Sequence, residues 1–234
     1  MSLQTYSVVL PIIGILSLAS LLVGLVYFVM AIVGWRGPHR NGRLVRSLAF
    51  ASVYPLAVVL VQFLIHRQVL PAMARESQQN REQRADAAAY VTRGDKVPSF
   101  RTRTTDGNEF AIDALRGKVV LVNFFATWCV PCVRELPHIE EIYKAHRDND
   151  SFSLLVIGRE ETDATVTEFK TTQQFSFPIA ADGDRSVYGL FAKELIPRTY
   201  LIAKDGTICF TSTGYSDEDM IALKSAVKTQ LSPK

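Results

Sequence analysis

The sequence predicts an α/β domain with a central mixed sheet flanked by helices, and a two-helix transmembrane anchor in front of it. From residue 93 onward, apolar runs of strand length alternate with patterns of helical period, which is typical of βαβ units. Before residue 70, two long stretches carry no charged side chain. The 234 residues suffice for one ordinary domain and an additional segment. We therefore expect a helical hairpin over residues 1–70, a polar stalk over 71–92 and a globular domain over 93–234.

The two uncharged stretches predict membrane spans at about residues 7–33 and 47–65. A bilayer core of about 30 Å needs about 20 helical residues, and both stretches come close to or exceed that length. A cleaved signal peptide is the alternative for the first stretch, but it needs a basic start and a shorter apolar core. The second stretch contains Pro55 and Gln62, so a buried or interfacial helix is its alternative.

The loop between these spans, residues 34–46, fixes the expected orientation. It carries four arginines and no acidic residue, and basic loops stay in the cytoplasm. Both termini then face outward; in a bacterium this means an anchor in the inner membrane, with the globular domain in the periplasm or outside. The bilayer is therefore an expected partner, and the polar stalk, helical or loosely ordered, is expected to act as a spacer.

The charge distribution excludes an electrostatic case for nucleic-acid binding. Residues 1–90 hold 8 Lys and Arg against 3 Asp and Glu, whereas the rest of the chain holds 18 against 20. The basic balance of the chain therefore comes from its N-terminal part, and the globular domain lacks the basic surface that nucleic acids require.

The strands of the globular domain are predicted by apolar runs and by two Asp-Gly pairs. The pair at 106–107 separates two short strand-like runs within 98–112, which indicates a hairpin. The pair at 205–206 joins two antiparallel strands within 199–212. Continuous apolar runs at 117–125 and 151–158 suit strands that are buried on both faces.

The helices are predicted by apolar periodicity and by capping residues. Residues 165–175 and 185–195 both have helical patterns, and Ser216 followed by Asp219 indicates the start of a closing helix. A further helix follows the segment FFATWCVPCVRELP, residues 124–137, and places four apolar residues on one face: Leu136, Ile139, Ile142 and Tyr143.

Cys129 and Cys132 in that segment permit three interpretations. A structural zinc site needs four ligands, but Cys209 stands alone and the histidine spacing does not suit a zinc site. A structural disulfide between residues so close in sequence would restrain very little chain. A redox pair is the interpretation that the surrounding pattern favours, since a CxxC motif near a βαβ pattern is typical of redox proteins.

The position of the cysteines supports redox chemistry on physical grounds. A buried strand ends, Cys129 lies at the turn, and a helix begins, so the free amides and the dipole of the helix favour a thiolate. Cys132 lies one turn further along, within reach of a mixed disulfide formed on Cys129. Pro131 lacks an amide hydrogen at a position where a helix does not need one.

The segment VVLVNFFATWCVPCVRELP resembles the active-site region of thioredoxin-like proteins, and in particular the membrane-anchored thiol–disulfide oxidoreductases of the TlpA/ResA type. Further matches are FSFPIAADGD, VYGLFAKELIPRTYLI and the DGTI turn, so the resemblance covers the chain from about residue 97 to its end. It implies a thioredoxin-like fold with Cys129 as the exposed nucleophile and Cys132 as the resolving thiol. It also implies that Trp128 flanks the disulfide, that Pro197 is a cis-proline facing the cysteines, and that Ile196 presents its backbone to substrate.

Two positions bear on how the cysteines would exchange protons. Asn123 stands where cytoplasmic thioredoxins carry a buried aspartate. Glu135 matches a glutamate that takes part in proton management in TlpA/ResA-type relatives, and a partly buried carboxyl can hold the proton that the second thiol loses. The alternative is an exposed glutamate that only interacts with the helix dipole.

Two further positions carry weaker expectations. Arg198 departs from the family pattern, which often has threonine at this position. Its side chain either approaches the cysteines or points to solvent, and the second interpretation is favoured. Cys209 lies in a strand pattern and is expected to be a buried, inert thiol. Pro137 is expected to kink the active-site helix by removing a hydrogen bond.

The implied function is reduction of protein disulfides by a membrane-tethered enzyme with no cofactor beyond its own Cys129–Cys132 disulfide. The resemblance implies extracytoplasmic cysteine-containing proteins as substrates, apocytochrome c among them, and a membrane thiol carrier as electron donor. An oxidant or isomerase of folding proteins is the alternative, because the sequence does not fix the reduction potential. A copper-binding module is a further alternative, although related copper proteins space their cysteines differently; no metal site is expected here.

Overall fold

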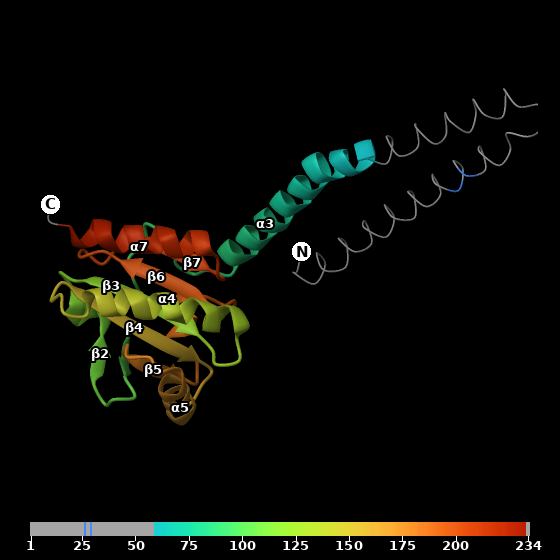
Figure 1. Ribbon diagram of the computed structural model, residues 1–234. Coiled ribbons are helices and arrows are strands. Elements are labelled where there is room, and N and C mark those ends of the chain that lie inside the picture. Colours follow the sequence, from blue (N-terminus) through green and yellow to red (C-terminus); the bar gives the residue numbers. More distant parts are fainter. Residues whose placement is uncertain (1–25, 27–28, 30–58, 233–234) are drawn as a thin grey trace, which may run out of the picture. The chain divides into compact units, whose positions relative to one another are not determined.

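The computed structural model describes residues 26, 29 and 59–232 (Figure 1). Apart from residues 26 and 29, the predicted first span lies outside the described residues, as do the basic loop and most of the second span, so the transmembrane hairpin stays a prediction. Within the described part of the chain, no helix is both long enough and apolar enough to cross a membrane. The chain divides into two compact units, Met1–Glu82 and Gln83–Lys234.

The predicted stalk is largely helical. A short π-helix, η2 (Ile65–Val69), is followed by the α-helix α3 (Leu70–Ala87), and neither has a buried residue. Polar side chains surround α3, so it has no apolar face that could pack into a core.

The globular unit begins about ten residues earlier than the sequence pattern predicts. Ala88 is only 3% exposed, and Ala89 forms an antiparallel bridge with Ala192. The amide of Tyr90 donates a hydrogen bond of 2.9 Å to the carbonyl of Phe191. The end of the stalk is therefore part of the folded domain, which the polar composition of this segment did not indicate.

A five-stranded mixed sheet forms the centre of the domain, as the sequence predicts. Its strand order is β5-β4-β3-β6-β7, with β3, β4 and β5 parallel and β6 antiparallel to both of its neighbours. All seven residues of β3 are buried, which explains its continuous apolar run. The strand bounds are β3 Val119–Phe125, β4 Phe152–Arg159, β5 Ile179–Asp182, β6 Arg198–Ile202 and β7 Ile208–Thr213.

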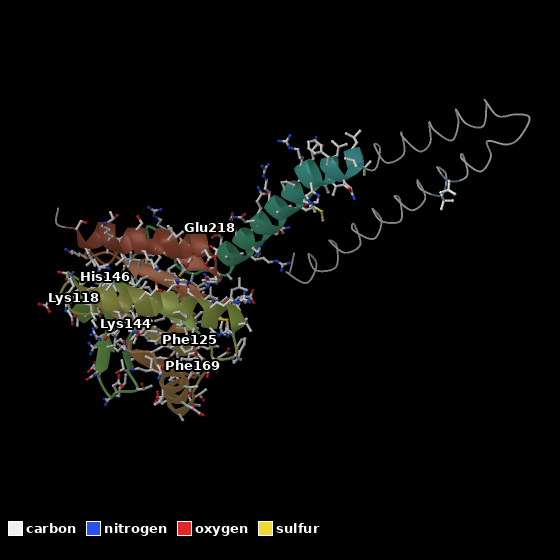
Figure 2. All side chains as sticks on the ribbon, in the orientation of Figure 1. Lys118, Phe125, Lys144, His146, Phe169 and Glu218 are labelled. Carbon is white, nitrogen blue, oxygen red and sulfur yellow. A yellow bond between two sulfur atoms is a disulfide. The ribbon has the colours of Figure 1, made fainter. Side chains whose placement is uncertain are left out.

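Alternate residues of β3 point to opposite faces of the sheet and enter two separate cores. Leu121 joins the core that is formed with α4 (Val130–His146), α5 (Asp163–Gln173) and α7 (Asp217–Leu231). Figure 2 shows Phe125 of β3 close to Phe169 of α5, with their ring centroids 5.4 Å apart.

The other face of the sheet is covered by smaller elements. Val122 joins a second core that contains residues of the strand β2 (Glu109–Ala111), the 3₁₀-helix η3 (Ile112–Leu115) and the short helix α6 (Tyr188–Phe191). The strand β2 pairs with β1 (Arg101–Arg103) across the Asp-Gly turn at 106–107, which confirms the predicted hairpin.

The helix expected over residues 185–195 is much shorter in the structure. The carboxylate of Asp182 accepts hydrogen bonds from the amides of Val187 and Tyr188, which starts α6 there. The helix ends after one turn because Ala192 has an extended backbone and bridges to Ala89. A long-range contact therefore overrides the local helical pattern. By contrast, the predicted cap of α7 is confirmed, since the Ser216 hydroxyl accepts from the amide of Asp219.

Candidate active site

The two cysteines form a disulfide at the point where β3 leads into α4. Their sulfur atoms are 2.08 Å apart, and Cys129 is the residue that caps the N-terminus of α4. The Cys129 sulfur accepts a hydrogen bond of 3.3 Å from the amide of Cys132. Pro131 lies in the first turn, as predicted. The same amide and the positive end of the helix would stabilise a thiolate on Cys129 once the disulfide is reduced.

Both cysteines of the disulfide are largely hidden from solvent. Cys129 is 5% exposed and Cys132 is fully buried, because both contribute to the core beneath α4. The prediction that Cys129 is freely exposed is therefore wrong for the disulfide state. Trp128 and Val130, on either side of Cys129 in sequence, are well exposed and give the surface around the sulfur an apolar character.

The loop of residues 193–197, called the 193–197 loop below, faces the cysteines. The peptide bond between Ile196 and Pro197 is cis, which confirms that prediction. The sulfur of Cys129 lies 3.9 Å from the carbonyl oxygen of Ile196. The tertiary structure therefore brings a main-chain acceptor from a distant part of the chain next to the first cysteine.

Glu135 is buried beneath this site and has two side-chain partners. Its carboxylate accepts a hydrogen bond of 2.9 Å from the Asn123 amide and one of 2.8 Å from the Thr199 hydroxyl. The same Asn123 amide nitrogen also donates to the Thr199 hydroxyl at 2.8 Å. Glu135 is only 1% exposed, so the alternative of an exposed glutamate is wrong.

The environment of Glu135 allows it to gain or lose a proton near neutral pH. Burial raises its pKa from 4.5 to about 7, the hydrogen bonds from Thr199 and Asn123 oppose that rise, and the negative charge of Asp219 adds to it. Glu135 follows Cys132 by one helical turn, so the carboxyl lies on the same side of α4 as the second cysteine.

Arg198 is neither exposed nor directed at the cysteines. It is 3% exposed, and its guanidinium donates to main-chain carbonyls on the side of the sheet opposite to Thr199. Its position opposite Phe124 in the β3–β6 register accounts for this direction, since neighbouring residues of a strand point to opposite faces. The favoured expectation of a solvent-facing arginine is therefore wrong.

The third cysteine, Cys209, is only partly buried, so the prediction of a buried thiol is wrong in that respect, but its contacts still favour an unreactive thiol. The Cys209 sulfur donates to the carbonyl of Leu201 at 3.2 Å, and burial raises the pKa of the thiol. A raised pKa lowers the thiolate fraction, and only the thiolate is an effective nucleophile.

Glu161 is a site residue that the sequence reasoning missed. It is 6% exposed, and its carboxylate accepts from the amide and the hydroxyl of Thr127, at 2.8 and 2.9 Å. It thereby holds the turn that leads to Cys129. A signal was present, because Glu161 follows a strand parallel to the strand that precedes Cys129, and such strands end at the same edge of a sheet.

Comparison with known sequences finds a family model and several relatives that match this chain. A model of the Redoxin family matches residues 92–231. The chain is 30% identical over 131 residues to the thiol-disulfide oxidoreductase ResA of Bacillus subtilis (strain 168), covering 56% of this chain and 73% of the relative. It is also 30% identical over 115 residues to ResA of Bacillus thuringiensis (strain Al Hakam), covering 49% and 66%. The chain thus spans roughly two thirds of the length of these relatives.

Comparison with solved structures gives a matching fold. The solution structure of a candidate protein disulfide isomerase from Bacteroides thetaiotaomicron aligns with a TM-score of 0.60 and 31% identity, covering 62% of this chain and 92% of that one. The crystal structure of a thiol:disulfide interchange protein of the thioredoxin family from Chlorobium tepidum TLS aligns with a TM-score of 0.51 and 28% identity, covering 61% and 99%. The domain thus has the thioredoxin-like fold that the active-site segment predicts.

Proposed function

Because this chain belongs to the Redoxin family and is a thiol–disulfide oxidoreductase of the TlpA/ResA type, we propose that it is a membrane-tethered reductant of protein disulfides outside the cytoplasm. The observation that carries the proposal is the Cys129–Cys132 pair at the N-terminus of α4, opposite the Ile196 carbonyl and above the buried carboxyl of Glu135. This arrangement combines a nucleophile, a resolving thiol, a main-chain contact for substrate and a group that can hold a proton.

The proposed reaction is two successive thiol–disulfide exchanges. The Cys129 thiolate attacks one sulfur of a substrate disulfide, a mixed disulfide forms, and the other substrate sulfur leaves as a thiolate. The Cys132 thiolate then attacks the Cys129 sulfur and releases the second substrate thiol. Two electrons pass to the substrate, and the enzyme ends with the Cys129–Cys132 disulfide that the structure contains.

Glu135 would serve the second exchange. Cys132 is fully buried, so its thiol cannot easily give its proton to water. A carboxylate one helical turn away can accept that proton, and a pKa of about 7 makes the transfer possible near neutral pH.

Substrate would bind in an extended form along the 193–197 loop. The Ile196 carbonyl lies beside the reactive sulfur and can accept a main-chain hydrogen bond, as in the addition of a strand. The exposed side chains of Trp128, Val130 and Leu195 favour apolar residues around the substrate cysteine. Apocytochrome c is the substrate that the family resemblance favours.

The cycle requires a dithiol donor that reduces Cys129–Cys132 again. A membrane thiol carrier fits the predicted inner-membrane anchor and the outward-facing domain.

The predicted orientation of the chain in the membrane can be tested by labelling single cysteines in intact cells with an impermeant reagent, in a background without the native cysteines. Asn41→Cys, in the predicted cytoplasmic loop, should stay unlabelled, whereas Ser232→Cys should react; the reverse pattern would reject the proposed compartment.

The reduction potential of the Cys129–Cys132 couple tests the direction of electron flow. A value near about −270 mV, similar to thioredoxin, supports a reductant, whereas a value near about −120 mV supports a folding oxidant. The likeness to a candidate disulfide isomerase is the observation that keeps this second function in view. A chain without a reversible two-electron couple would not support either function.

A trapping experiment would identify the partners. Cys132→Ala removes the thiol that resolves the mixed disulfide, so substrates should remain attached to Cys129. The double variant Cys129→Ala/Cys132→Ala is the matched control and should trap none. If both variants retained the same proteins, the proposed roles of the two cysteines would be wrong.

A further inference from the structure

Arg198 is a buried cation whose guanidinium donates to three main-chain carbonyls. Its Nε donates to the carbonyls of Glu194 and Leu195, at 3.2 Å each, and its Nη2 donates to the carbonyl of Ala85 at 2.9 Å. Within residues 59–232 it forms no ion pair. A buried charge is tolerated only where hydrogen bonds replace its hydration, so these contacts account for its position.

The carbonyls that Arg198 contacts in the 193–197 loop belong to a backbone that needs external support. Leu195 has a φ of 76°, in the left-handed region that bulky residues rarely occupy. Such a conformation persists only where the surroundings fix it. The Leu195 carbonyl accepts from the Arg198 guanidinium and, at 2.8 Å, from the hydroxyl of Tyr188. The next residue, Ile196, presents its carbonyl to Cys129.

The third contact joins this loop to the end of the stalk helix. Ala85 lies in the last turn of α3, where carbonyls lack helical partners and the dipole is negative, so a guanidinium is a favourable cap. The amide of Lys193 also donates to the carbonyl of Ala88 at 2.8 Å. The planar guanidinium can reach both segments at once, which the hydroxyl of a threonine or the single ammonium of a lysine cannot do equally well.

We propose that Arg198 is a positioning residue that fixes the 193–197 loop to the end of α3, so that binding of an extended peptide substrate depends on the stalk end, residues 85–91. The inference rests on the proposed function only in that the loop is taken to bind substrate. It assigns a role to a residue that touches neither the cysteines nor the substrate.

The test compares the full-length chain with its Arg198→Met variant, which keeps the apolar stem and removes every donor. With a disulfide peptide as substrate and dithiothreitol as reductant, the variant should raise KM about tenfold and leave kcat unchanged. Its reaction with a small aromatic disulfide should be unchanged, because that reagent does not use the loop. Amide hydrogen exchange should increase in both the 85–91 and 191–197 segments. Arg147→Met, which removes an exposed arginine, is the control and should change none of these values.

The proposal is overturned if a folded Arg198→Met chain keeps the wild-type KM and exchange rates. If that variant does not fold, Arg198→Lys and Tyr188→Phe decide the question, since each weakens the support of the loop only in part. A smaller rise in KM for both would support the proposal, and wild-type values for both would reject it. If the wild-type chain fails to reduce the peptide, the proposed function fails, and the exchange rates alone then decide whether Arg198 joins the two segments.

Discussion

At the scale of single residues, Glu135 lies in an environment where ionisation of its carboxyl group is costly. Glu135 loses its hydration on burial, and hydrogen bonds from the side chains of Asn123 and Thr199 replace part of it. Burial penalises the charged form more than the two hydrogen bonds favour it, so the pKa rises to about 7. Both protonation states are therefore accessible near neutral pH, which a proton acceptor for Cys132 requires.

Removing this carboxyl should change the pH dependence of the second exchange. In the wild type, Glu135 is ionised above about pH 7 and can accept a proton, and below about pH 5 it is protonated and cannot. We expect Glu135→Gln to slow resolution of a preformed mixed disulfide by about a hundredfold at pH 8, with the two rates converging at pH 5. Stopped-flow measurement across this range checks the prediction.

The matched control for Glu135 is Glu141→Gln, which changes an exposed glutamate on the same helix. It should leave the pH profile unchanged. If the Glu135→Gln profile also equalled that of the wild type, Glu135 would have no role in proton transfer.

The Thr199 hydroxyl should determine where that profile has its midpoint. Its hydrogen bond favours the ionised form of Glu135, so Thr199→Val should raise the pKa of the carboxyl further. The midpoint of the resolution rate should then move to higher pH, and Thr199→Ser should restore it. A midpoint that moved to lower pH, or that the serine failed to restore, would contradict this assignment.

At the scale of elements, a buried carboxylate ties α4 to the segment that precedes β5. Glu140, on α4, accepts hydrogen bonds from the amide and hydroxyl of Ser176 and from the amide of Phe177. Lys144 lies one turn further along α4 and pairs with it at 3.2 Å. The active-site helix is thereby held in place at a point well away from its cysteines.

Neutralising Glu140 should destabilise the domain and leave its redox chemistry intact. Hydrogen bonds to a charged group contribute about 1.5–3 kcal/mol, so we expect Glu140→Gln to lower the free energy of unfolding by about 2 kcal/mol. Denaturant titration at pH 7 measures this change, with Glu141→Gln as the exposed control. A loss below about 0.5 kcal/mol would show that the bonds to Ser176 and Phe177 contribute little.

At the scale of the whole molecule, the polar stalk and the globular domain do not separate where the composition changes. The domain includes the end of α3 and the residues after it, because Ala88 is buried and Tyr90 and Lys193 form hydrogen bonds across this junction. The residues at the start of the globular unit therefore contact the 193–197 loop that faces the cysteines.

Two fragments test this boundary. A fragment of residues 83–234 keeps the contacts of Ala85, Ala88 and Tyr90, and a fragment of residues 93–234 loses them. The Val91 amide, which donates to the Phe191 carbonyl, is lost as well, so at about 1 kcal/mol for each of these four hydrogen bonds we expect the shorter fragment to be less stable by roughly 4 kcal/mol. Thermal and denaturant unfolding of the two fragments provides the measurement. Equal stability would place the boundary at residue 93 after all.

The sequence by itself determined the chemistry of Cys129 and Cys132 and most of the sheet. The CxxC motif, the apolar run before it and the helical pattern after it are adjacent in the chain, so local rules are enough to interpret them. The same holds for the Asp-Gly turns and for the Ser216 cap, where each signal lies within a few residues of its effect.

Only the tertiary structure decided the surroundings of the cysteines. Burial by the fold raises the pKa of Glu135 and brings Thr199, which lies 64 residues away in sequence, next to its carboxylate, and Arg198 reaches Ala85 across 113 residues. The short α6 likewise ends where Ala192 meets Ala89, against its local helical pattern. Burial, and the choice of partner for a buried polar group, depend on which distant segments the fold brings together. No local pattern records that, so these features became visible only in the folded chain.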